Sequence, residues 1–482
     1  MELILEKLIP IVGSRGWKNP DSKNTKYLND ITSFKNGTPS IILLPQSTEQ
    51  ITKIMHICSD FNWPISVQGG LTGLVQGAVP FDNEIVLSLE KMNSIVEIDP
   101  ISLNAVVQSG VTIQSFQNLL DERNLFFPLD LGSKGSCLIG GALSTNAGGT
   151  RVIKYGMMRS LTLGLEVVLA DGSVIRNLNS LLKDNSGYDL KHLFIGSEGT
   201  LGVITQASLK LFPKPKSQNV AFCGLDHFSQ LIDLLVRCKN DLGDDLSAFE
   251  VLWKPTYELI INSTDVKPPL SKDYNYYVLI ETMGNKIKVD DEWFEKVLGG
   301  FINDKLINDA VLSSSKKDVN NIWAVRENTS TAFKKIHKRL NFDVSLSLNT
   351  MEIFIKKLTK KLTMLREVEE ILFFGHLGDN NLHAVVVCNE FTEKIKKTFY
   401  SLVGEFGGSI SAEHGIGLEK KPYLGFSRTK NEIKLMKDLK NKLDPHNILN
   451  RNRIFDLSSN QKLKFDSDLK NKFRPEFLNL KL

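Results

Sequence analysis

The sequence predicts an α+β protein built from two main units, and three observations lead to this fold class. The first part of the chain alternates short apolar runs with helix-type repeats and contains several stretches rich in glycine. Lys214-Pro215-Lys216 then marks a change of composition where a linker is expected. The following part alternates strands with longer amphipathic helices, which is typical of an antiparallel sheet with helices on one face. A chain of 482 residues is long enough for two or three hydrophobic cores.

Composition and charge exclude several classes of protein. Lys and Arg number 59 against 55 Asp and Glu, without a basic block, so nucleic-acid binding is not expected. The five cysteines include no C-x-x-C pair, which indicates reduced thiols and a cytoplasmic location. No apolar run approaches the roughly 20 residues of a membrane-spanning helix. Attachment to the surface of the inner membrane and assembly into a homodimer stay open.

The first unit begins with an amphipathic helix over residues 1–10, because Glu2, Glu6 and Lys7 interrupt the apolar run before it reaches signal-peptide length. Ser47-Thr48-Glu49-Gln50 has the pattern of a capping box and predicts a helix start between strands at 41–44 and 64–67. Further strands are expected at 84–89, 104–108, 163–170, 173–175 and 202–212.

The second unit is expected to contain an antiparallel sheet and helices on one of its faces. The strands are predicted at 219–224, 246–252, 276–281, 342–348, 371–374 and 382–387. The helices are predicted near 228–240, 290–302, 350–366 and 391–406. The tail after Phe455 is rich in Lys, Asn and Asp, and we expect it to be loosely held.

Three glycine-rich stretches stand out in the first unit. The first, Gly69-Gly70-Leu71-Thr72-Gly73, follows a strand directly, and glycine there lets backbone N–H groups close on a diphosphate. It matches neither G-x-G-x-x-G nor a P-loop, and one such turn alone is more often ordinary structure. The second, residues 128–149, is a long loop of small residues suited to lie along a large ligand. The third, residues 195–204, leads into a strand.

In this order and spacing the three stretches resemble the FAD-binding domain of vanillyl-alcohol oxidase and the cresol methylhydroxylase flavoprotein. The segments 129–149, 163–171 and 184–204 are most similar to the D-2-hydroxyglutarate and D-lactate dehydrogenase branch of that superfamily. The resemblance implies a two-subdomain FAD-binding domain, a substrate (cap) domain and a helical C-terminal segment. Because the first glycine turn contains no His, it implies a non-covalent FAD. The implied cofactor-binding residues are Gly69, Gly70, Leu71, Thr72, Gly73, Gln76, Leu131, Gly135, Ser136, Gly140, Gly141, Thr145, Asn146, Gly148, Tyr155, Gly156, Glu198, Gly199, Val203, Ile204 and Asn450.

A cluster of histidines and a carboxylate lies in the second half of the chain. His376 and His383 flank Gly378-Asp379-Asn380-Asn381, which reads as a hairpin loop, so the two rings lie on adjacent strands. Two histidines make at most half of a zinc shell, and Glu413 beside His414, at the end of an expected strand, offers a third ligand. Any one of these His, taken alone, could equally be a hydrogen-bonded residue at a sheet edge.

The resemblance continues through these residues and implies their roles. The family patterns His-x-Gly-Asp-Gly-Asn-x-His and Glu-His-Gly-x-Gly imply His376, His383 and Glu413 as ligands of a divalent metal, with zinc favoured. They imply His414 as the general base, with both His376 and His414 in contact with substrate. Trp323-Ala324-Val325-Arg326-Glu327 is similar to the Trp-x-x-Arg-Glu segment, which implies Arg326 as a catalytic clamp on the substrate carboxylate and Ser330 as an assisting hydroxyl.

Three positions depart from the family pattern. Asn380 replaces a Gly, although Asn tolerates the same left-handed backbone. Asn341 stands where the hydroxyglutarate enzymes carry a Lys, and Val385 stands where they carry an Asn. Both changes remove a group for a second carboxylate or the substrate head, so we expect a small 2-hydroxy acid other than hydroxyglutarate.

The expected function is an FAD-dependent dehydrogenase that oxidises a D-2-hydroxy acid to the 2-oxo acid with a metal's assistance. The electron acceptor stays open between a quinone, an electron-transfer flavoprotein and a cytochrome. Two alternatives are a redox-neutral flavin transferase of the same fold and a non-catalytic flavin electron-relay subunit. The expected domains are an N-terminal helical segment at 1–36, the FAD-binding domain at 37–215, the substrate domain at 216–420 and a C-terminal helical segment at 421–482 that returns to the FAD-binding domain.

Overall fold

The computed structural model describes residues 2–457 and divides the chain into two compact units. Within the described residues, the first unit comprises residues 2–149, 156–214 and 413–457, and the second comprises residues 150–155 and 215–412. The predicted tail after Phe455 lies almost entirely outside the described residues. The division at 412/413 falls eight residues before the boundary expected at 420, and the six-residue segment 150–155 was not expected to join the second unit.

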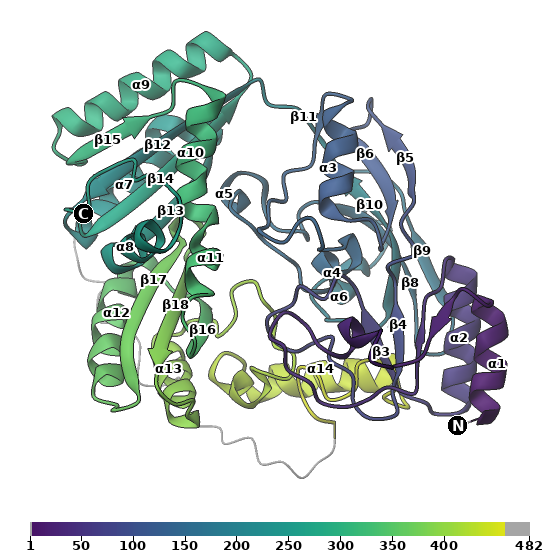
Figure 1. Ribbon diagram of the computed structural model, residues 1–482. Coiled ribbons are helices and arrows are strands. Elements are labelled where there is room, and N and C mark those ends of the chain that lie inside the picture. The colour runs from purple at the N-terminus through teal and green to yellow at the C-terminus, as the bar shows by residue number, and fades with distance from the viewer. Residues whose placement is uncertain (1, 458–482) are drawn as a thin grey trace. The chain divides into compact units, whose positions relative to one another are not determined.

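The first unit contains three sheets and several helices (Figure 1). Its strands are β1 (Trp17–Lys18), β2 (Ile41–Leu43), β3 (Ile65–Gln68), β4 (Ile85–Ser88), β5 (Ile95–Asp99), β6 (Asn104–Gln108), β7 (Leu125–Phe126), β8 (Thr162–Val168), β9 (Val174–Asn177), β10 (Val203–Lys210) and β11 (Phe212–Pro213). Its helices are α1 (Glu2–Val12), α2 (Thr48–Asp60), α3 (Ile113–Asp121), α4 (Ile139–Ser144), α6 (Lys191–Phe194) and α14 (Lys430–Leu443), with short 3-10 turns η1 (Thr25–Leu28) and η4 (Lys421–Phe426).

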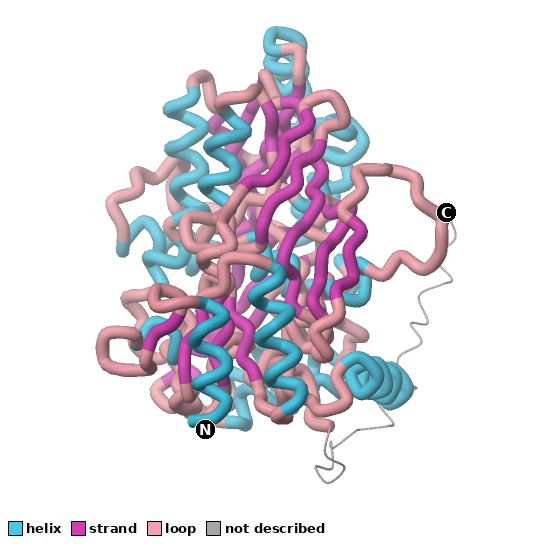
Figure 2. The backbone as a smooth tube through the Cα atoms, turned by 90° about the vertical axis from the view of Figure 1, so that its right-hand side faces the viewer, coloured by secondary structure: helices cyan, strands magenta, loops and turns pink. Residues whose placement is uncertain are grey.

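A four-stranded sheet of order β1-β2-β4-β3 forms one half of this unit, and β4 pairs in parallel with both β2 and β3. Helix α2 connects β2 to β3, as the apolar spacing predicts, and α1 lies beside it (Figure 1, Figure 2). Their apolar faces share one core with this sheet and with Val168 and Val203 of the antiparallel sheet β5-β6-β10-β8-β9. Helix α2 therefore packs between the two sheets.

The start of α2 confirms its predicted cap but not the reciprocal capping box. The Ser47 hydroxyl accepts from the Gln50 N–H at 3.2 Å, which satisfies one of the free donors of the first turn. The Gln50 side chain accepts from the N–H of Gln46 at 2.8 Å instead of that of Ser47. The predicted capping box is wrong by one residue, because the Gln50 side chain bonds to the N–H of the residue that precedes the cap residue Ser47.

The second unit is organised around one antiparallel sheet of seven strands in the order β15-β12-β14-β13-β17-β18-β16. The strands are β12 (Ser217–Leu225), β13 (Leu246–Trp253), β14 (Tyr276–Gly284), β15 (Asp309–Leu312), β16 (Arg339–Ser345), β17 (Val368–His376) and β18 (Asn381–Cys388). Its helices are α5 (Val152–Tyr155), α7 (Phe228–Leu242), α8 (Lys254–Ser263), α9 (Ile287–Asn303), α10 (Lys316–Glu327), α11 (Thr329–Phe333), α12 (Leu348–Thr363) and α13 (Glu393–Glu405), with η2 (Gly243–Asp245) and η3 (Leu377–Asp379).

Helices cover both faces of this sheet, so the expectation of helices on one face is wrong. The four predicted helices, α7, α9, α12 and α13, share a face on which Phe228 packs near Trp253 and Phe399 stacks on Phe342. On the other face, α8 and α10 bury apolar side chains against alternate residues of β12, β13 and β14. This second face carries the candidate site.

Strand boundaries differ from their predictions by up to three residues, and one strand is displaced as a whole. The strand expected at 342–348 spans Arg339–Ser345, and α12 already begins at Leu348. The apolar alternation of Val344, Leu346 and Leu348 continues past the end of the strand. This pattern alone therefore does not show at which residue the strand ends and the helix begins. Among residues 2–457, no helix is both long and apolar enough to cross a bilayer.

Candidate active site

The first two glycine-rich stretches lie directly against each other in the first unit. A Cβ added to Gly70 would lie 2.0 Å from the carbonyl oxygen of Ser136, and one added to Gly69 would lie 3.3 Å from the Cα of Gly141. No side chain fits at Gly70 without moving the second stretch. The two segments are thus held at backbone contact distance.

Other glycines of the second stretch leave their backbone uncovered. A Cβ added to Gly132, Gly135 or Gly141 would meet no other atom within 4 Å. Such a surface, free of side chains and lined by peptide groups, suits a large flat ligand with a diphosphate. The residues present therefore fit FAD. The second half of this stretch, expected as a loop, forms the short helix α4 at Ile139–Ser144.

The third stretch and Asn450 join this group. The N–H of Glu198 donates to the carbonyl of Ser144 at 2.8 Å. The Asn450 side chain accepts from the N–H of Val67 at 2.8 Å and donates to the carbonyl of Glu198 at 2.7 Å. Asn450, predicted to bind the cofactor, thus connects the strand before the first stretch to the third stretch.

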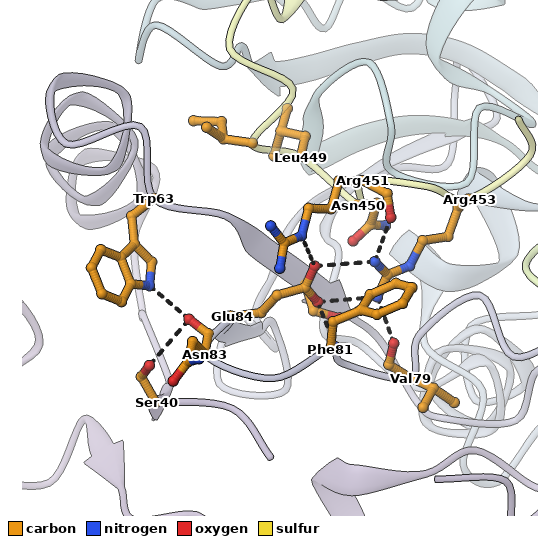
Figure 3. A network of polar contacts seen from close by, with 12 residues as sticks. Ser40, Trp63, Val79, Phe81, Asn83, Glu84, Leu449, Asn450, Arg451 and Arg453 are labelled. Carbon is orange, nitrogen blue, oxygen red and sulfur yellow. Dashed lines mark hydrogen bonds and ion pairs between the residues drawn. The ribbon is translucent and has the colours of Figure 1, made fainter. Parts of the chain in front are cut away.

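A buried charge network holds the segment around Asn450 (Figure 3). The Glu84 carboxylate is fully buried and accepts from Arg453 at 3.2 Å and from Arg451 at 3.1 Å. The Arg453 guanidinium also donates to the carbonyls of Gly77 and Val79. Because a buried ion is stable only when its hydrogen bonds are satisfied, this network fixes the backbone that follows Asn450.

The remaining predicted cofactor residues differ in backbone conformation, burial and unit. Leu71, Gln76 and Asn146 have left-handed backbones, with φ of 58°, 63° and 49°, in the loops themselves. Val203 and Ile204 are buried, and Val203 belongs to the hydrophobic core, so their backbone is what a ligand could meet. Tyr155 is the last residue of α5 in the second unit, whereas the others belong to the first. Those others are Thr72, Gly73, Leu131, Gly135, Ser136, Gly140, Thr145, Gly148, Gly156 and Gly199.

In the second unit, Glu250 holds two of the predicted site residues. It lies on β13 opposite His376 of β17, and its carboxylate accepts from Nδ1 of His376 at 2.6 Å and from Nε of Arg326 at 2.7 Å. Burial opposes ionisation of Glu250, but the charges of His376 and Arg326 outweigh it and lower its pKa. Glu250 is therefore an anionic anchor.

This anchor decides the tautomer of His376. An ionised carboxylate only accepts hydrogen bonds, so Nδ1 of His376 carries a proton, and whenever the ring is neutral its lone pair is on Nε2. A terminal nitrogen of Arg326 lies 3.5 Å from Nε2, as a donor would. A carboxylate-binding cation and an imidazole lone pair are thus neighbours on one face of the sheet.

His383 lies next to His376 on β18, as the hairpin predicted, and the two ring centroids are 5.3 Å apart. Its ring stacks on Phe374, and Nδ1 lies 3.8 Å from the carboxylate of Asp343 on β16. Asn380 in the loop has a φ of 71°, which confirms the expected left-handed backbone. Two imidazoles at this separation fit a zinc-like ion, but a cation on Nε2 of His376 would have to displace the guanidinium of Arg326.

The segment that carries Arg326 is itself anchored. The Trp323 indole donates to the buried carboxylate of Glu281 at 2.9 Å, one helical turn before Arg326. Arg326 also lies over the ring of Phe374, 5.0 Å from its centroid. The hydroxyl that bonds to the Arg326 carbonyl is that of buried Thr329, at 2.6 Å, whereas the predicted Ser330 is exposed.

Glu413 and His414 lie in the first unit, so the predicted metal set is divided between the units at the 412/413 boundary. Nε2 of His414 lies 3.9 Å from the Glu413 carboxylate. The strand expected before Glu413 is reduced to one isolated bridge between Ser409 and Ser345. The glycines that follow, Gly415 and Gly417, bend the chain away with φ of 87° and 51°.

The two positions that depart from the hydroxyglutarate pattern are cross-strand partners. Asn341 of β16 pairs with Val385 of β18, two residues from Asp343 and His383. Val385 is buried in an apolar cluster with Phe333 and Leu372. This part of the sheet face therefore offers no polar group at Val385.

Sequence reasoning missed Glu250, Asp343 and Thr329. Glu250 had a signal, because it is a single carboxylate in the largely apolar strand Leu246–Trp253, whereas Asp343 shares its strand with Arg339 and Asn341. An ionised group in such a place must have a charged or donating partner. Thr329 had no comparable signal, since a Thr at a helix start is common.

Comparison with known proteins agrees with this arrangement. Residues 39–177 match the family model described as "FAD binding domain", and residues 214–454 match "FAD linked oxidases, C-terminal domain". The chain is 38% identical to the D-2-hydroxyglutarate–pyruvate transhydrogenase of Saccharomyces cerevisiae, covering 90% of this chain and 91% of that protein. It is 39% identical to the mitochondrial D-2-hydroxyglutarate dehydrogenase of Rattus norvegicus, covering 91% and 82%.

Solved structures show the same fold at low identity. p-Cresol methylhydroxylase aligns with a TM-score of 0.75 at 16% identity, covering 95% of this chain and 98% of that one. Alkyldihydroxyacetonephosphate synthase aligns with a TM-score of 0.72 at 18% identity, covering 93% and 85%. The chain therefore belongs to the FAD-linked oxidases with a cresol-methylhydroxylase-type FAD-binding domain, on the branch of the D-2-hydroxyglutarate and D-lactate dehydrogenases.

Proposed function

We propose that this protein oxidises a small D-2-hydroxy acid to the 2-oxo acid with FAD as the hydride acceptor. The observation that carries the proposal is the Glu250 anchor, which holds a terminal nitrogen of Arg326 3.5 Å from Nε2 of His376. A 2-hydroxy acid presents a carboxylate beside a hydroxyl, which matches a guanidinium beside an imidazole. The names of the relatives support the substrate class.

Arg326 binds the substrate carboxylate through its two terminal nitrogens, because its Nε is already bonded to Glu250. The planar fork fixes the direction of the neighbouring C–H and O–H bonds. His376 and His383, with Glu413, would hold a divalent cation, which we take as zinc, once the terminal nitrogens of Arg326 turn from Nε2 of His376 to the substrate carboxylate. Such an ion would polarise the substrate hydroxyl. Phe374 packs beneath both Arg326 and His383 and gives the site an apolar floor.

His414 takes the proton of the substrate hydroxyl as the C2 hydride leaves, so that a neutral 2-oxo group is formed. Covalent continuity supports the inclusion of Glu413 and His414. The Ser411 hydroxyl donates to Asp343 at 3.4 Å within the second unit. Glu413 follows two residues later, and two trans peptide units span at most about 7.6 Å. FAD, when bound, accepts the hydride and passes the electrons on.

We extend the proposal to the link between protein and cofactor and to the electron acceptor. The cofactor is bound without a covalent link, and the electron acceptor is a quinone, an electron-transfer flavoprotein or a cytochrome. The cytoplasmic location stays a prediction. The buried Val385, opposite Asn341, supports a substrate without a second carboxylate, while the relatives are named for hydroxyglutarate.

The test is anaerobic bleaching of the flavin absorption band at about 450 nm, which reports reduction of the cofactor. The panel contains D- and L-lactate, D- and L-2-hydroxyglutarate and longer apolar 2-hydroxy acids, each with and without a chelator. We expect bleaching by one or more D-acids and loss of bleaching with the chelator. Faster bleaching by D-2-hydroxyglutarate than by D-lactate would overturn the substrate preference and leave the reaction class intact.

Absence of bleaching by every acid, with FAD bound and metal present, would contradict the proposal. A redox-neutral transferase would then be the next candidate, since alkyldihydroxyacetonephosphate synthase shares the fold. Bleaching that persists after metal removal would reject the role of the cation but not the proposed reaction.

A further inference from the structure

Glu198 in the third glycine-rich stretch has its carboxylate directed at the protein itself. One carboxylate oxygen accepts from the N–H of Ile416 at 2.7 Å, and the other accepts from the N–H of Gly417 at 2.8 Å. The side chain is buried, and burial raises its pKa while the two N–H groups lower it. A residue expected to contact the cofactor therefore binds the loop that follows His414.

The backbone of Glu198 is bonded as fully as its carboxylate. Its N–H donates to the carbonyl of Ser144 in the second stretch, and its carbonyl accepts from the Asn450 side chain. Its φ of 53° is left-handed, which a non-glycine residue adopts only when its surroundings hold it there. Glu198 thus connects the glycine-rich stretches to the loop at 413–417 through its backbone and its side chain.

The loop at 413–417 is also fitted closely to its supports. A Cβ added to Gly415 would lie 3.0 Å from Oε1 of Glu198, and one added to Gly417 would lie 2.0 Å from the carbonyl of Val75. That carbonyl also accepts from the N–H groups of Leu418 and Glu419. The loop is therefore held between Glu198 on one side and Val75 on the other.

We propose that Glu198 is a positioning residue, which holds the 413–417 loop and so sets the place of His414 relative to the flavin-binding stretches. The inference rests on the proposed function, in which His414 is the base. Because both carboxylate oxygens of Glu198 accept backbone N–H bonds, we assign this side chain no proton transfer and no contact with the substrate. Its two accepted N–H bonds fix the backbone two and three residues after His414.

The first test compares Glu198→Gln with Glu166→Gln in the FAD-loaded protein. Gln can accept one of the two N–H bonds but turns an amide NH₂ toward the other. Glu166 is a matched control, because it is buried in the same unit and accepts from Thr48, Thr205 and Gln206 away from the 413–417 loop. Hydrogen exchange followed by mass spectrometry reports on peptides that cover residues 413–418.

We expect faster exchange over 413–418 in Glu198→Gln and wild-type exchange there in Glu166→Gln. Against the best substrate, we expect kcat to fall about 10- to 100-fold in Glu198→Gln with little change in KM, because a displaced base weakens the transition state more than substrate binding. The flavin spectrum and content should match those of Glu166→Gln.

Unchanged exchange over 413–418 in Glu198→Gln would overturn the inference, whatever the activity. Faster exchange with an unchanged kcat would also overturn it, because the loop would then not set the base. If none of the hydroxy acids reduces the flavin of the wild-type protein, the proposed function fails. Faster exchange confined to 413–418 in Glu198→Gln would still support the positioning role.

A second variant protects the test against misfolding of Glu198→Gln. Gly415→Ala leaves Glu198 intact but places a methyl group 3.0 Å from its carboxylate at a φ of 87°. It should show the same faster exchange and the same fall of kcat. Wild-type values for both quantities in Gly415→Ala would contradict the inference.

Discussion

Buried polar side chains support the functional groups of both units, but they hold different parts of the chain. In the first unit, Asn450 and Glu198 bond to backbone atoms of the glycine-rich stretches and the loop near His414. In the second unit, Glu250 bonds to the side chains of Arg326 and His376. The first unit should therefore be sensitive to added volume, and the second to the loss of one charge or one ring nitrogen.

The largest effect is expected for Arg326→Lys. Lys has no Nε to bond with Glu250 and no planar fork for a carboxylate. We expect kcat/KM to fall about 100-fold or more, measured by flavin reduction. Arg339→Lys on β16 is the control, because this Arg donates to the carbonyl of Ile336 and is outside the anchor. Equal activity of the two variants would contradict the role of Arg326.

Removal of the anchoring charge should come next. Glu250→Gln keeps the shape but can no longer accept from both His376 and Arg326 as an anion. We expect kcat/KM and zinc affinity to fall about 10- to 100-fold, as is usual when the partner of a metal-binding His is removed. Glu370→Gln on the same sheet is exposed and should behave like wild type. If both variants retain full activity, the two-sided anchor is not needed for the reaction.

Added volume in the first unit separates packing from cofactor contact. Gly70→Ala places a methyl group 2.0 Å from the Ser136 carbonyl, so the apoprotein should lose about 1–3 kcal/mol of stability. Gly135→Ala meets no protein atom within 4 Å, so the apoprotein should unfold like wild type but bind FAD more weakly. Thermal unfolding of both apoproteins and flavin titration distinguish the two cases. Equal unfolding temperatures for the two variants would reject the backbone contact.

The smallest effect is expected outside both sites, at Glu405 on α13. Burial opposes its ionisation, but Lys357 and Lys361 outweigh burial and lower its pKa. Its contribution to stability is therefore present above the ordinary pKa of 4.5 and is lost as pH falls through the lower folded value. Because the lysines are about 40% exposed, the loss should stay below about 1 kcal/mol.

The free energy of unfolding against pH tests this sign. The wild-type curve should fall more steeply below the ordinary pKa than the curve of Glu405→Gln, which has no titrating group there. Parallel curves would show that the ion pairs contribute nothing measurable.

The helices of the second unit show how far sequence patterns reach. The predicted helices are present because each buries a regular apolar face on the sheet, as Leu231, Leu234 and Leu235 of α7 do. Helix α10 escaped prediction because Lys316 and Lys317 begin it and its apolar residues are spread. Arg326, which lies on this helix, was identified instead by the resemblance of its segment to the Trp-x-x-Arg-Glu pattern.

By itself, the sequence determined the class of fold, the three glycine-rich stretches, and the hairpin that places His376 beside His383. These features depend on residues close together in the chain, where spacing and backbone preference act directly. Only the tertiary structure decided what holds them. Glu250 precedes His376 by 126 residues, and Asn450 follows Val67 by 383. Such pairs carry no local signal, because a carboxylate becomes an anchor only when folding removes water from it and brings donors to both its oxygens.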